Sequence, residues 1–293
     1  MGTGELAAFG TALCWTVTVM SFETAGKKVG SLSVNVIRLF LGLVFLSVYC
    51  LLTRGRLFPT DAGGFRWIWL GLSGVVGFFL GDLCLFRAFI LIGSRITMVI
   101  FAMVPPVTAL TGWMLLGETL QLKHWAGMVI TVTGISMVIL VRESKKVKLA
   151  HPLGGIVLAL LGTLGQAVGL VLSKYGMGTY NAFAATQIRI IAALATFLLI
   201  LPFFGFTKKI AKASANRNAM GFITLGSFFG PFLGVSLSLV AVSLTKVGIA
   251  STIMAMVPVL IILPEVFLLG KRVRPLEVAG AFVAVAGVAL VSL

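Results

Sequence analysis

Ten long apolar runs follow one another along the chain, and they constrain its fold more than any other feature. They occupy approximately residues 4–22, 31–52, 66–89, 95–116, 122–141, 153–173, 182–204, 218–242, 248–269 and 275–293. A run of about 20 residues crosses the roughly 30 Å hydrocarbon core of a bilayer as a helix. Since backbone polar groups need internal partners there, and no alternation typical of barrel strands occurs, we expect an all-α polytopic membrane protein.

The composition supports this expectation and gives the net charge its meaning. Hydrophobic residues make up 59% and charged residues 11% of the 293 residues, against about 45–50% and about 25% in soluble domains. The net charge of +15 comes from Lys and Arg that lie mainly between the apolar runs. Basic residues there mark cytoplasmic connections and meet lipid headgroups. The lipid bilayer is therefore an expected partner, and nucleic acid is not.

The second half of the sequence repeats the first. The tetrapeptide Ala-Met-Val-Pro stands at 102–105 and again at 255–258, an offset of 153 residues. The same offset relates further identical residues: Gly77 and Gly230, Gly81 and Gly234, Gly117 and Gly270, Gly127 and Gly280, Gly134 and Gly287. A constant offset of this kind indicates an internal repeat.

Each copy holds five apolar runs, and this odd number determines how the copies are related. The second copy has to enter the membrane from the opposite side, so we predict inverted repeats at 1–146 and 147–293. Secondary transporters are commonly built from such repeats, because two similar packings of one chain open to alternate sides. The prediction is therefore ten transmembrane helices in two inverted five-helix repeats, which rock around a site near the midplane.

The repeated proline should interrupt a helix at the same position in both copies. Pro105 and Pro258 lack a backbone donor, so the carbonyls of Phe101 and Met254 lose their usual helical partners. Such breaks are tolerated where neighbours or a wet cavity satisfy the carbonyl. We expect the fourth and ninth helices to bend beside a cavity, with a packing kink of no ligand role as the alternative.

Asp82 is the clearest candidate for chemistry, because it lies past the middle of the third run. A charge near the bilayer centre costs about 2.5–3.5 kcal/mol on insertion scales, so such residues usually face the bundle interior or water. The equivalent position holds Val235, and this asymmetry favours function over a shared role in the fold. We predict that Asp82 couples transport to protons or binds a substrate ammonium group, with a structural ion pair to Arg38 or Arg87 as the alternative.

Glu265 is the second acid inside a run, in the outer half of the ninth. Its equivalent position holds Gly112, so it too has no repeat counterpart. We expect it at the mouth of a cavity or in an ion pair with Lys246 or Arg272.

Four other side chains within the runs correspond to one another under the repeat. Arg38 and Arg189 are equivalent at an offset of 151, so we expect a shared structural role as intramembrane charges; a substrate-carboxylate site is the alternative. Trp15 and Gln166 correspond to within one position and are expected to line a cavity or to pack. Lys174, near the end of its run, is expected to reach toward the interface.

Signatures of catalysis do not occur in the sequence. It has two histidines and three cysteines, without a Ser-His-acid set, a metal-binding spacing or a phosphate-binding Gly-rich loop. We therefore expect neither an enzyme nor a cofactor or metal. A lipid-modifying membrane enzyme remains as the weaker alternative, beside a transport-inactive scaffold or sensor.

The repeat contains the motifs of a known family. Pro105 is followed twelve residues later by Gly117 and Glu118, and the next helix carries Gly127 and Gly134. The second half repeats this pattern, with Lys271 where glutamate is usual. Over its whole length the chain resembles the drug/metabolite transporter superfamily, in its EamA-type ten-helix branch.

The resemblance implies a function and a location. It implies export of small organic metabolites, often amino acids, across the prokaryotic inner membrane, through a central cavity lined by helices one, three, four, six, eight and nine. The expected substrate-binding residues on these helices are Trp15, Asp82, Pro105, Gln166, Ser236, Ser238, Pro258 and Glu265. A monomer or a homodimer would be compatible with this arrangement.

Orientation is the point on which the resemblance and the charge pattern disagree. Connections 1–2, 3–4, 5–6, 7–8 and 9–10 hold fourteen Lys and Arg, and the other four hold six. The positive-inside rule therefore places both termini outside the cytoplasm. Ten-helix relatives have both termini inside. We follow the charge count as the expectation.

Overall fold

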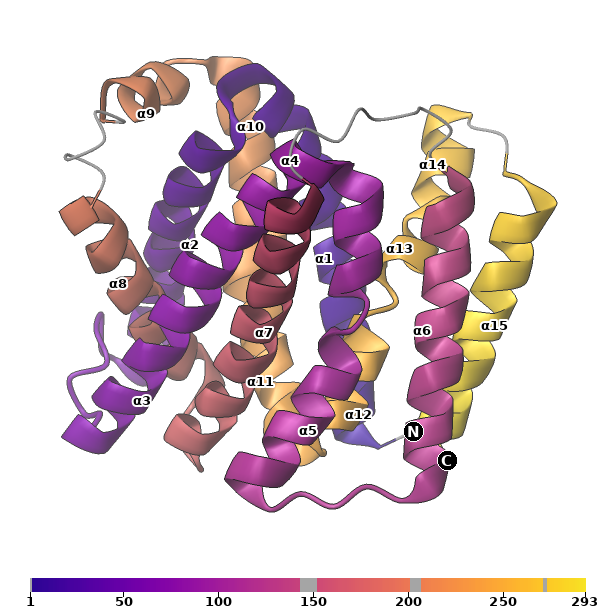
Figure 1. Ribbon diagram of the computed structural model, residues 1–293. Coiled ribbons are helices and arrows are strands. Elements are labelled where there is room, and N and C mark those ends of the chain that lie inside the picture. The colour runs from indigo at the N-terminus through magenta and orange to yellow at the C-terminus, as the bar shows by residue number, and fades with distance from the viewer. Residues whose placement is uncertain (1, 143–151, 201–206, 271–272) are drawn as a thin grey trace.

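The computed structural model describes every residue except 1, 143–151, 201–206 and 271–272. In this described part, ten helical segments are long and apolar enough to cross a membrane, and the regular elements are all helical. These segments coincide with the ten predicted runs, so the all-α, ten-span prediction is confirmed. Figure 1 shows them standing side by side, with both chain ends on the lower face and α9 on the upper face. The predicted boundary at 146/147 lies outside the described residues.

The first repeat has one helix that changes geometry halfway and one that breaks. Its elements are α1 (Thr3–Val29), α2 (Ser31–Arg54), α3 (Gly64–Gly74), the π-helical η1 (Val75–Gly81), α4 (Asp82–Phe101), α5 (Val104–Leu116) and α6 (Leu122–Arg142). The third span comprises α3, η1 and the first part of α4. Gly93, at φ 79°, separates the third span from the fourth. The fourth span comprises the end of α4 and all of α5.

The second repeat has the same order of spans as the first, with one added helix between two of them. Its elements are α7 (Pro152–Met177), α8 (Ala182–Ile200), the short α9 (Thr207–Ser214), α10 (Arg217–Ser227), the π-helical η3 (Phe228–Gly234), α11 (Val235–Leu244), α12 (Val247–Met254), α13 (Val257–Leu260), α14 (Ile262–Leu269) and α15 (Pro275–Ser292). The eighth span comprises α10, η3 and α11. The addition, α9, lies in the connection between the seventh and eighth spans.

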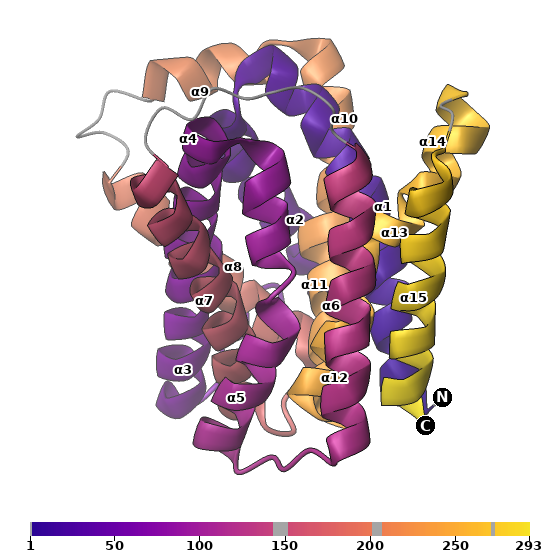
Figure 2. The same cartoon turned by 45° about the vertical axis from the view of Figure 1, so that its right-hand side comes forward.

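The contact between α6 and α15 shows directly that the repeats are inverted. Gly127 faces Gly287, and Gly134 faces Gly280, so the two helices run antiparallel, and Figure 2 shows them side by side. Gly127 thus contacts Gly287, the repeat equivalent of Gly134, and Gly134 contacts Gly280, the repeat equivalent of Gly127. A two-fold axis requires this exchange. A Cβ on Gly134 would lie 2.6 Å from the Gly280 carbonyl oxygen, so only small residues permit this approach.

The first helix of each repeat packs against the other repeat. In α1, Thr18 Oγ1 donates to the Gly226 carbonyl at 3.4 Å, and Trp15 fills the space beside Gly234. In α7, Ser173 Oγ lies 2.7 Å from Ser73 Oγ of α3. The two repeats therefore interlock through their first helices.

The repeated Ala-Met-Val-Pro interrupts both helices as predicted. The regular α-helix ends at Phe101 and resumes at Val104, with a tighter turn between them, and the same happens between Met254 and Val257. Pro105 and Pro258 each stand in the first turn of the following helix, where a missing N–H is tolerated. The breaks are confirmed; that they border a cavity stays a prediction.

The two π-helical segments were not predicted from the sequence. They cover seven residues each, Val75–Gly81 and Phe228–Gly234, and lie 153 residues apart. π-helical turns are rare and concentrate at functional sites. Because both repeats have one at the same place in their third helix, this geometry belongs to the duplicated fold.

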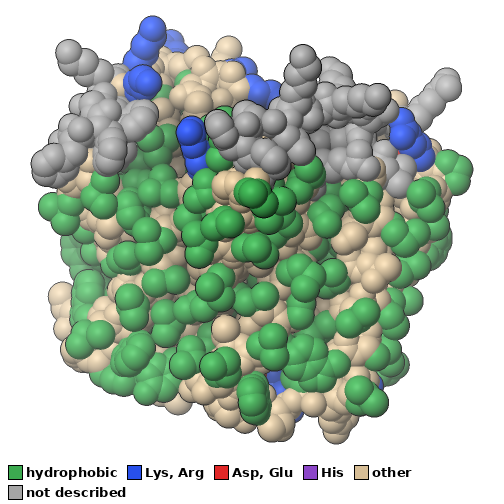
Figure 3. Space-filling model, in the orientation of Figure 1, with side chains coloured by type: hydrophobic (Ala, Val, Ile, Leu, Met, Phe, Trp, Pro, Cys, Tyr) green, Lys and Arg blue, Asp and Glu red, His purple; other side chains and the backbone are tan. Residues whose placement is uncertain are grey.

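Lys and Arg gather at one edge of the molecule. Figure 3 shows a flank covered by hydrophobic side chains, with blue basic groups mainly along the upper edge. Both chain ends lie at the opposite edge (Figures 1 and 2). The positive-inside rule would place this basic edge in the cytoplasm and both termini outside it. The orientation itself stays a prediction.

Candidate functional site

Asp82 lies at the point where η1 ends and α4 begins, and it is 8% exposed. Its Oδ2 forms an ion pair with Arg38 Nη2 of α2. Its Oδ1 accepts a hydrogen bond from Gln166 Nε2 of α7 at 2.8 Å. The structure thus pairs Asp82 with Arg38, and both carboxylate oxygens have a partner. These contacts compensate for part of the cost of burying the charge.

Arg38 is held by neighbours on two further sides. Its Nε donates to Asn35 Oδ1 at 2.7 Å, and its guanidinium lies 5.6 Å from the Phe22 ring centroid. Asn35 is fully buried, and its Nδ2 has no partner among the described residues. Residues of the first, second, third and sixth spans therefore meet around one carboxylate.

Gln166 connects this cluster to the π-helical segment. Besides Asp82, its Nε2 reaches the Gly77 carbonyl oxygen at 3.1 Å. The two helices come close enough for this because they meet at glycines: a Cβ on Gly165 would lie 3.0 Å from the Gly81 Cα. Since Gln166 belongs to the second repeat and Asp82 to the first, the cluster joins the two repeats inside the membrane.

Arg189, the repeat equivalent of Arg38, contacts η1 without a carboxylate. It is 4% exposed, and its guanidinium lies 4.4 Å from the centroid of the Phe78 ring. Its Nε is buried without a hydrogen-bond partner in the described structure. The two arginines thus have different environments: Arg38 forms an ion pair, and Arg189 lies against an aromatic ring.

The remaining predicted residues do not contact the Asp82 cluster through any hydrogen bond of the described structure. Trp15 packs against Gly234 in the core, and Pro105 and Pro258 lie at the helix breaks. Ser236 and Ser238 are buried in α11; Ser238 Oγ donates to the Val235 carbonyl, and Ser236 Oγ has no partner among the described residues.

Glu265 lies in α14, beyond the second helix break. Lys246, one of its predicted partners, stands at the other end of the same span and donates to the Thr119 carbonyl at 2.5 Å. The other, Arg272, lies outside the described residues.

A second polar cluster, at the lower end of the bundle, was missed by the sequence analysis. Glu118 Oε1 accepts from Lys174 Nζ at 2.6 Å, and its Oε2 accepts from the Val247 N–H at 2.8 Å. Lys174 also donates to the Thr245 carbonyl at 2.8 Å. Lys174 therefore does not simply reach toward the interface as expected. The cluster joins the ends of the fourth, sixth and eighth spans to the start of the ninth.

The signal for this cluster was present in part. Gly117, before Glu118, has φ 66°, a conformation that favours glycine, and it directs the chain so that Glu118 lies at the start of α12. A carboxylate there satisfies an otherwise unpaired helix N–H. Its pairing with Lys174, 56 residues away, could not be read from the spacing.

Ten apolar spans in interlocked inverted repeats, with a buried charge cluster joining them, are the architecture of a polytopic membrane protein and are common among secondary transporters. A sequence model of the EamA-like transporter family matches residues 2–140 and again 153–293. The protein belongs to the EamA-like transporter family. The resemblance stated from the motifs is thereby confirmed.

Similarity to solved structures supports the same fold. One crystal structure of a protein aligns with a TM-score of 0.82 at 17% sequence identity, covering 99% of this chain and 95% of the other. At this identity the likeness shows the fold alone. No curated protein matches the chain.

Proposed function

We propose that the protein is a secondary transporter of the prokaryotic inner membrane that exports small organic metabolites, such as amino acids, by alternating access. The observation that carries this proposal is the Arg38–Asp82–Gln166 contact, which joins the inverted repeats at a buried carboxylate. Buried ionisable groups in membrane helices usually serve ion or substrate pathways.

We propose that transport is coupled to protons through this contact. Both partners donate to Asp82, so both favour the ionised carboxylate. Protonation of Asp82 removes the negative charge that holds Arg38, and it weakens the hydrogen bond from Gln166, because a neutral carboxyl oxygen is a poorer acceptor than a carboxylate. The link between the repeats is then weakened, so binding and release of a proton would shift the balance between the two access states.

Alternating access is supported by the lower cluster and the helix breaks. The Glu118–Lys174 ion pair and its contacts hold four spans together at the lower end. Opening this end would require the ion pair to separate. Because the repeats interlock, we propose that the motion occurs about the breaks at 102–103 and 255–256 rather than between the two sequence halves.

The experiment is export of metabolites by reconstituted protein under an imposed pH gradient. Vesicles are loaded with a panel of labelled amino acids, and wild type is compared with Asp82→Asn. The matched control is Asp61→Asn, which changes an acid outside the spans. We expect wild type and the control to respond to the gradient and Asp82→Asn to lose that response. If Asp82→Asn keeps the full response, protons do not couple through Asp82; if wild type moves none of the panel, this substrate class is wrong.

A further inference from the structure

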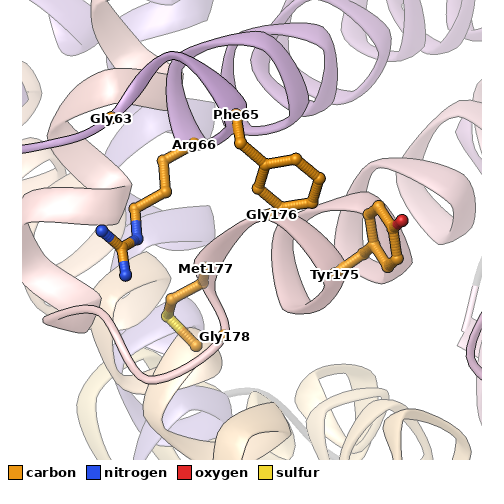
Figure 4. Close-up of a pocket in the computed structure, with 7 residues that line it drawn as sticks. All are labelled: Gly63, Phe65, Arg66, Tyr175, Gly176, Met177 and Gly178. Atoms are coloured by element: carbon orange, nitrogen blue, oxygen red, sulfur yellow. The ribbon is translucent and has the colours of Figure 1, made fainter.

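A cavity of about 260 Å³ lies between the start of α3 and the end of α7, away from the Asp82 cluster. Figure 4 shows Phe65 and Tyr175 on one side of it, Met177 near its middle and the Arg66 side chain on the other side. Gly63, Gly176 and Gly178 complete the lining. One span begins here and another ends, so the cavity lies at the level of the lipid headgroups.

Close packing of the two helices keeps the cavity at their edge. A Cβ on Gly176 would lie 2.7 Å from Trp69 Cβ, so the α3 and α7 backbones touch beside it. The volume is below the roughly 300–1,000 Å³ of pockets that enclose a drug-sized ligand. It therefore suits one end of a larger molecule whose remainder stays outside.

The charges around the cavity are unbalanced. The only acid of the connection between the second and third spans, Asp61, is engaged by Arg54 at 2.6 Å and by the Tyr180 hydroxyl at 2.8 Å, with Arg56 at 3.7 Å. Partial burial by itself raises the pKa of Asp61, but the hydrogen bonds from Tyr180 and Arg54 hold it below its usual value. Asp61 therefore stays ionised at neutral pH and still leaves a positive surplus.

Arg66 is the cation that lines the cavity. Its guanidinium lies 4.8 Å from the Tyr180 ring centroid, and no carboxylate pairs with it in the described structure. The lower face carries few basic residues, and three of the six in its connections, Arg54, Arg56 and Arg66, belong to this one. The concentration of positive charge is therefore local.

The outer rim of the cavity is aromatic. The Tyr175 ring lies 5.5 Å from the Phe65 ring and 5.0 Å from the Trp69 ring, between centroids. Phe65 is 54% and Tyr175 42% exposed, on the surface that faces lipid. Tyr and Trp at this depth are typical of residues that contact headgroups and the first acyl carbons.

We propose that this cavity is a binding site for an anionic phospholipid, with Arg66 at the phosphate and the first acyl carbons against Phe65 and Tyr175. The cavity offers an apolar wall and a cation together, which an amphiphilic anion matches. A free phosphate would leave the wall uncovered. A zwitterionic lipid would bring an ammonium group toward the surplus positive charge.

The experiment measures lipid binding to the purified full chain in detergent. Dioleoyl phosphatidylglycerol is compared with dioleoyl phosphatidylcholine by native mass spectrometry and by the shift in melting temperature. We expect the anionic lipid to bind wild type at least fivefold more tightly. Arg66→Gln should remove that preference and Arg66→Lys should keep most of it. Arg56→Gln, which removes a charge from the same connection without lining the cavity, should change binding less than twofold.

Three outcomes would overturn the proposal. Equal binding of the two lipids to wild type does so without any variant, even if Arg66→Gln fails to fold. Equal losses in Arg66→Gln and Arg56→Gln would mean that surface charge alone attracts the lipid. Binding of glycerol 3-phosphate as tight as that of the whole lipid would make the site one for a soluble phosphate.

Discussion

Lys174 Nζ lies 2.6 Å from Glu118 Oε1, so one ion pair joins the end of the sixth span to the residues that follow the fourth. Both side chains are mostly buried, and each also contacts the backbone where the eighth span ends and the ninth begins. A pair held in this way differs from an exposed ion pair, because each partner would leave backbone groups unsatisfied if it were removed.

Replacing Glu118 with Gln should therefore destabilise the protein. We expect a loss of about 1–3 kcal/mol, because Lys174 loses its carboxylate and the Val247 N–H loses a charged acceptor. The measurement is thermal unfolding in detergent. Glu23→Gln, which breaks the exposed pair with Lys27, is the control and should leave the melting temperature unchanged. Equal effects of the two variants would show that the lower cluster does not hold the spans.

Arg38 and Asp82 should be energetically coupled. Each single variant, Arg38→Met or Asp82→Leu, leaves a buried charge without its counter-charge, whereas the double variant removes both charges. We expect the double variant to be more stable than either single one, with a coupling energy of about 1–3 kcal/mol. A double-mutant cycle of unfolding free energies measures it. Additive losses would contradict the pairing.

Arg189→Met should not lower the free energy of unfolding, whereas Arg38→Met should. Arg189 is buried with no carboxylate partner among the described residues, so its replacement removes a desolvation cost without breaking an ion pair. We expect Arg189→Met to be neutral or up to about 3 kcal/mol more stable than wild type. Thermal unfolding again provides the measurement. A loss as large as that of Arg38→Met would mean that Arg189 is compensated in a way its contacts do not reveal.

The glycine contact of α6 and α15 should not tolerate a methyl group. A Cβ on Gly134 would lie 2.3 Å from the Ala284 nitrogen, and a Cβ on Gly287 2.5 Å from the Thr131 nitrogen. These are backbone atoms, so the helices themselves would have to move apart. We expect Gly134→Ala and Gly287→Ala each to cost about 1–3 kcal/mol of stability.

Gly221→Ala is the matched control for both substitutions. Its Cβ would meet nothing within 4 Å, and alanine favours the helix by about 1 kcal/mol. The readout is the yield of folded protein and its melting temperature. Full tolerance at Gly134 and Gly287 would contradict the close contact of the two helices.

A reporter fused after Leu293 should be active only if it is one that works outside the cytoplasm. The edge rich in Lys and Arg lies opposite both chain ends (Figures 1 and 3), and the positive-inside rule places that edge in the cytoplasm. Alkaline phosphatase activity is expected, and fluorescence of a cytoplasm-only reporter is not. The reverse result would place both termini inside, as in the ten-helix relatives.

The spans and their breaks could be predicted because each depends on local chemistry. Hydrocarbon length set the ten runs, and a proline without its N–H set the breaks before Pro105 and Pro258. The inversion followed from an odd number of helices per repeat. The spans and the breaks need only the residues of one segment, and the inversion needs only the number of spans in each repeat.

The site could be predicted only in part, because its contacts depend on helix orientation. Asp82 could be identified because a buried charge is costly in the membrane. Whether it pairs with Arg38 or with Arg87 depends on the direction in which η1 orients its side chain. Arg38 and Arg189 were expected to act alike. They differ because only the first repeat has an acid after its π-helical segment, where the second has Val235.

The π-helical segment before Asp82 determines the direction in which the carboxylate of Asp82 points. A π-helical turn contains one residue more than an α-helical turn, and each residue of an α-helix advances it by about 100°. If the same residues Val75–Gly81 formed an ordinary α-helix, the carboxylate of Asp82 would therefore point about a quarter of a circle away from Arg38 and Gln166. In this helix the number of residues per turn, as much as their identity, decides where the negative charge points.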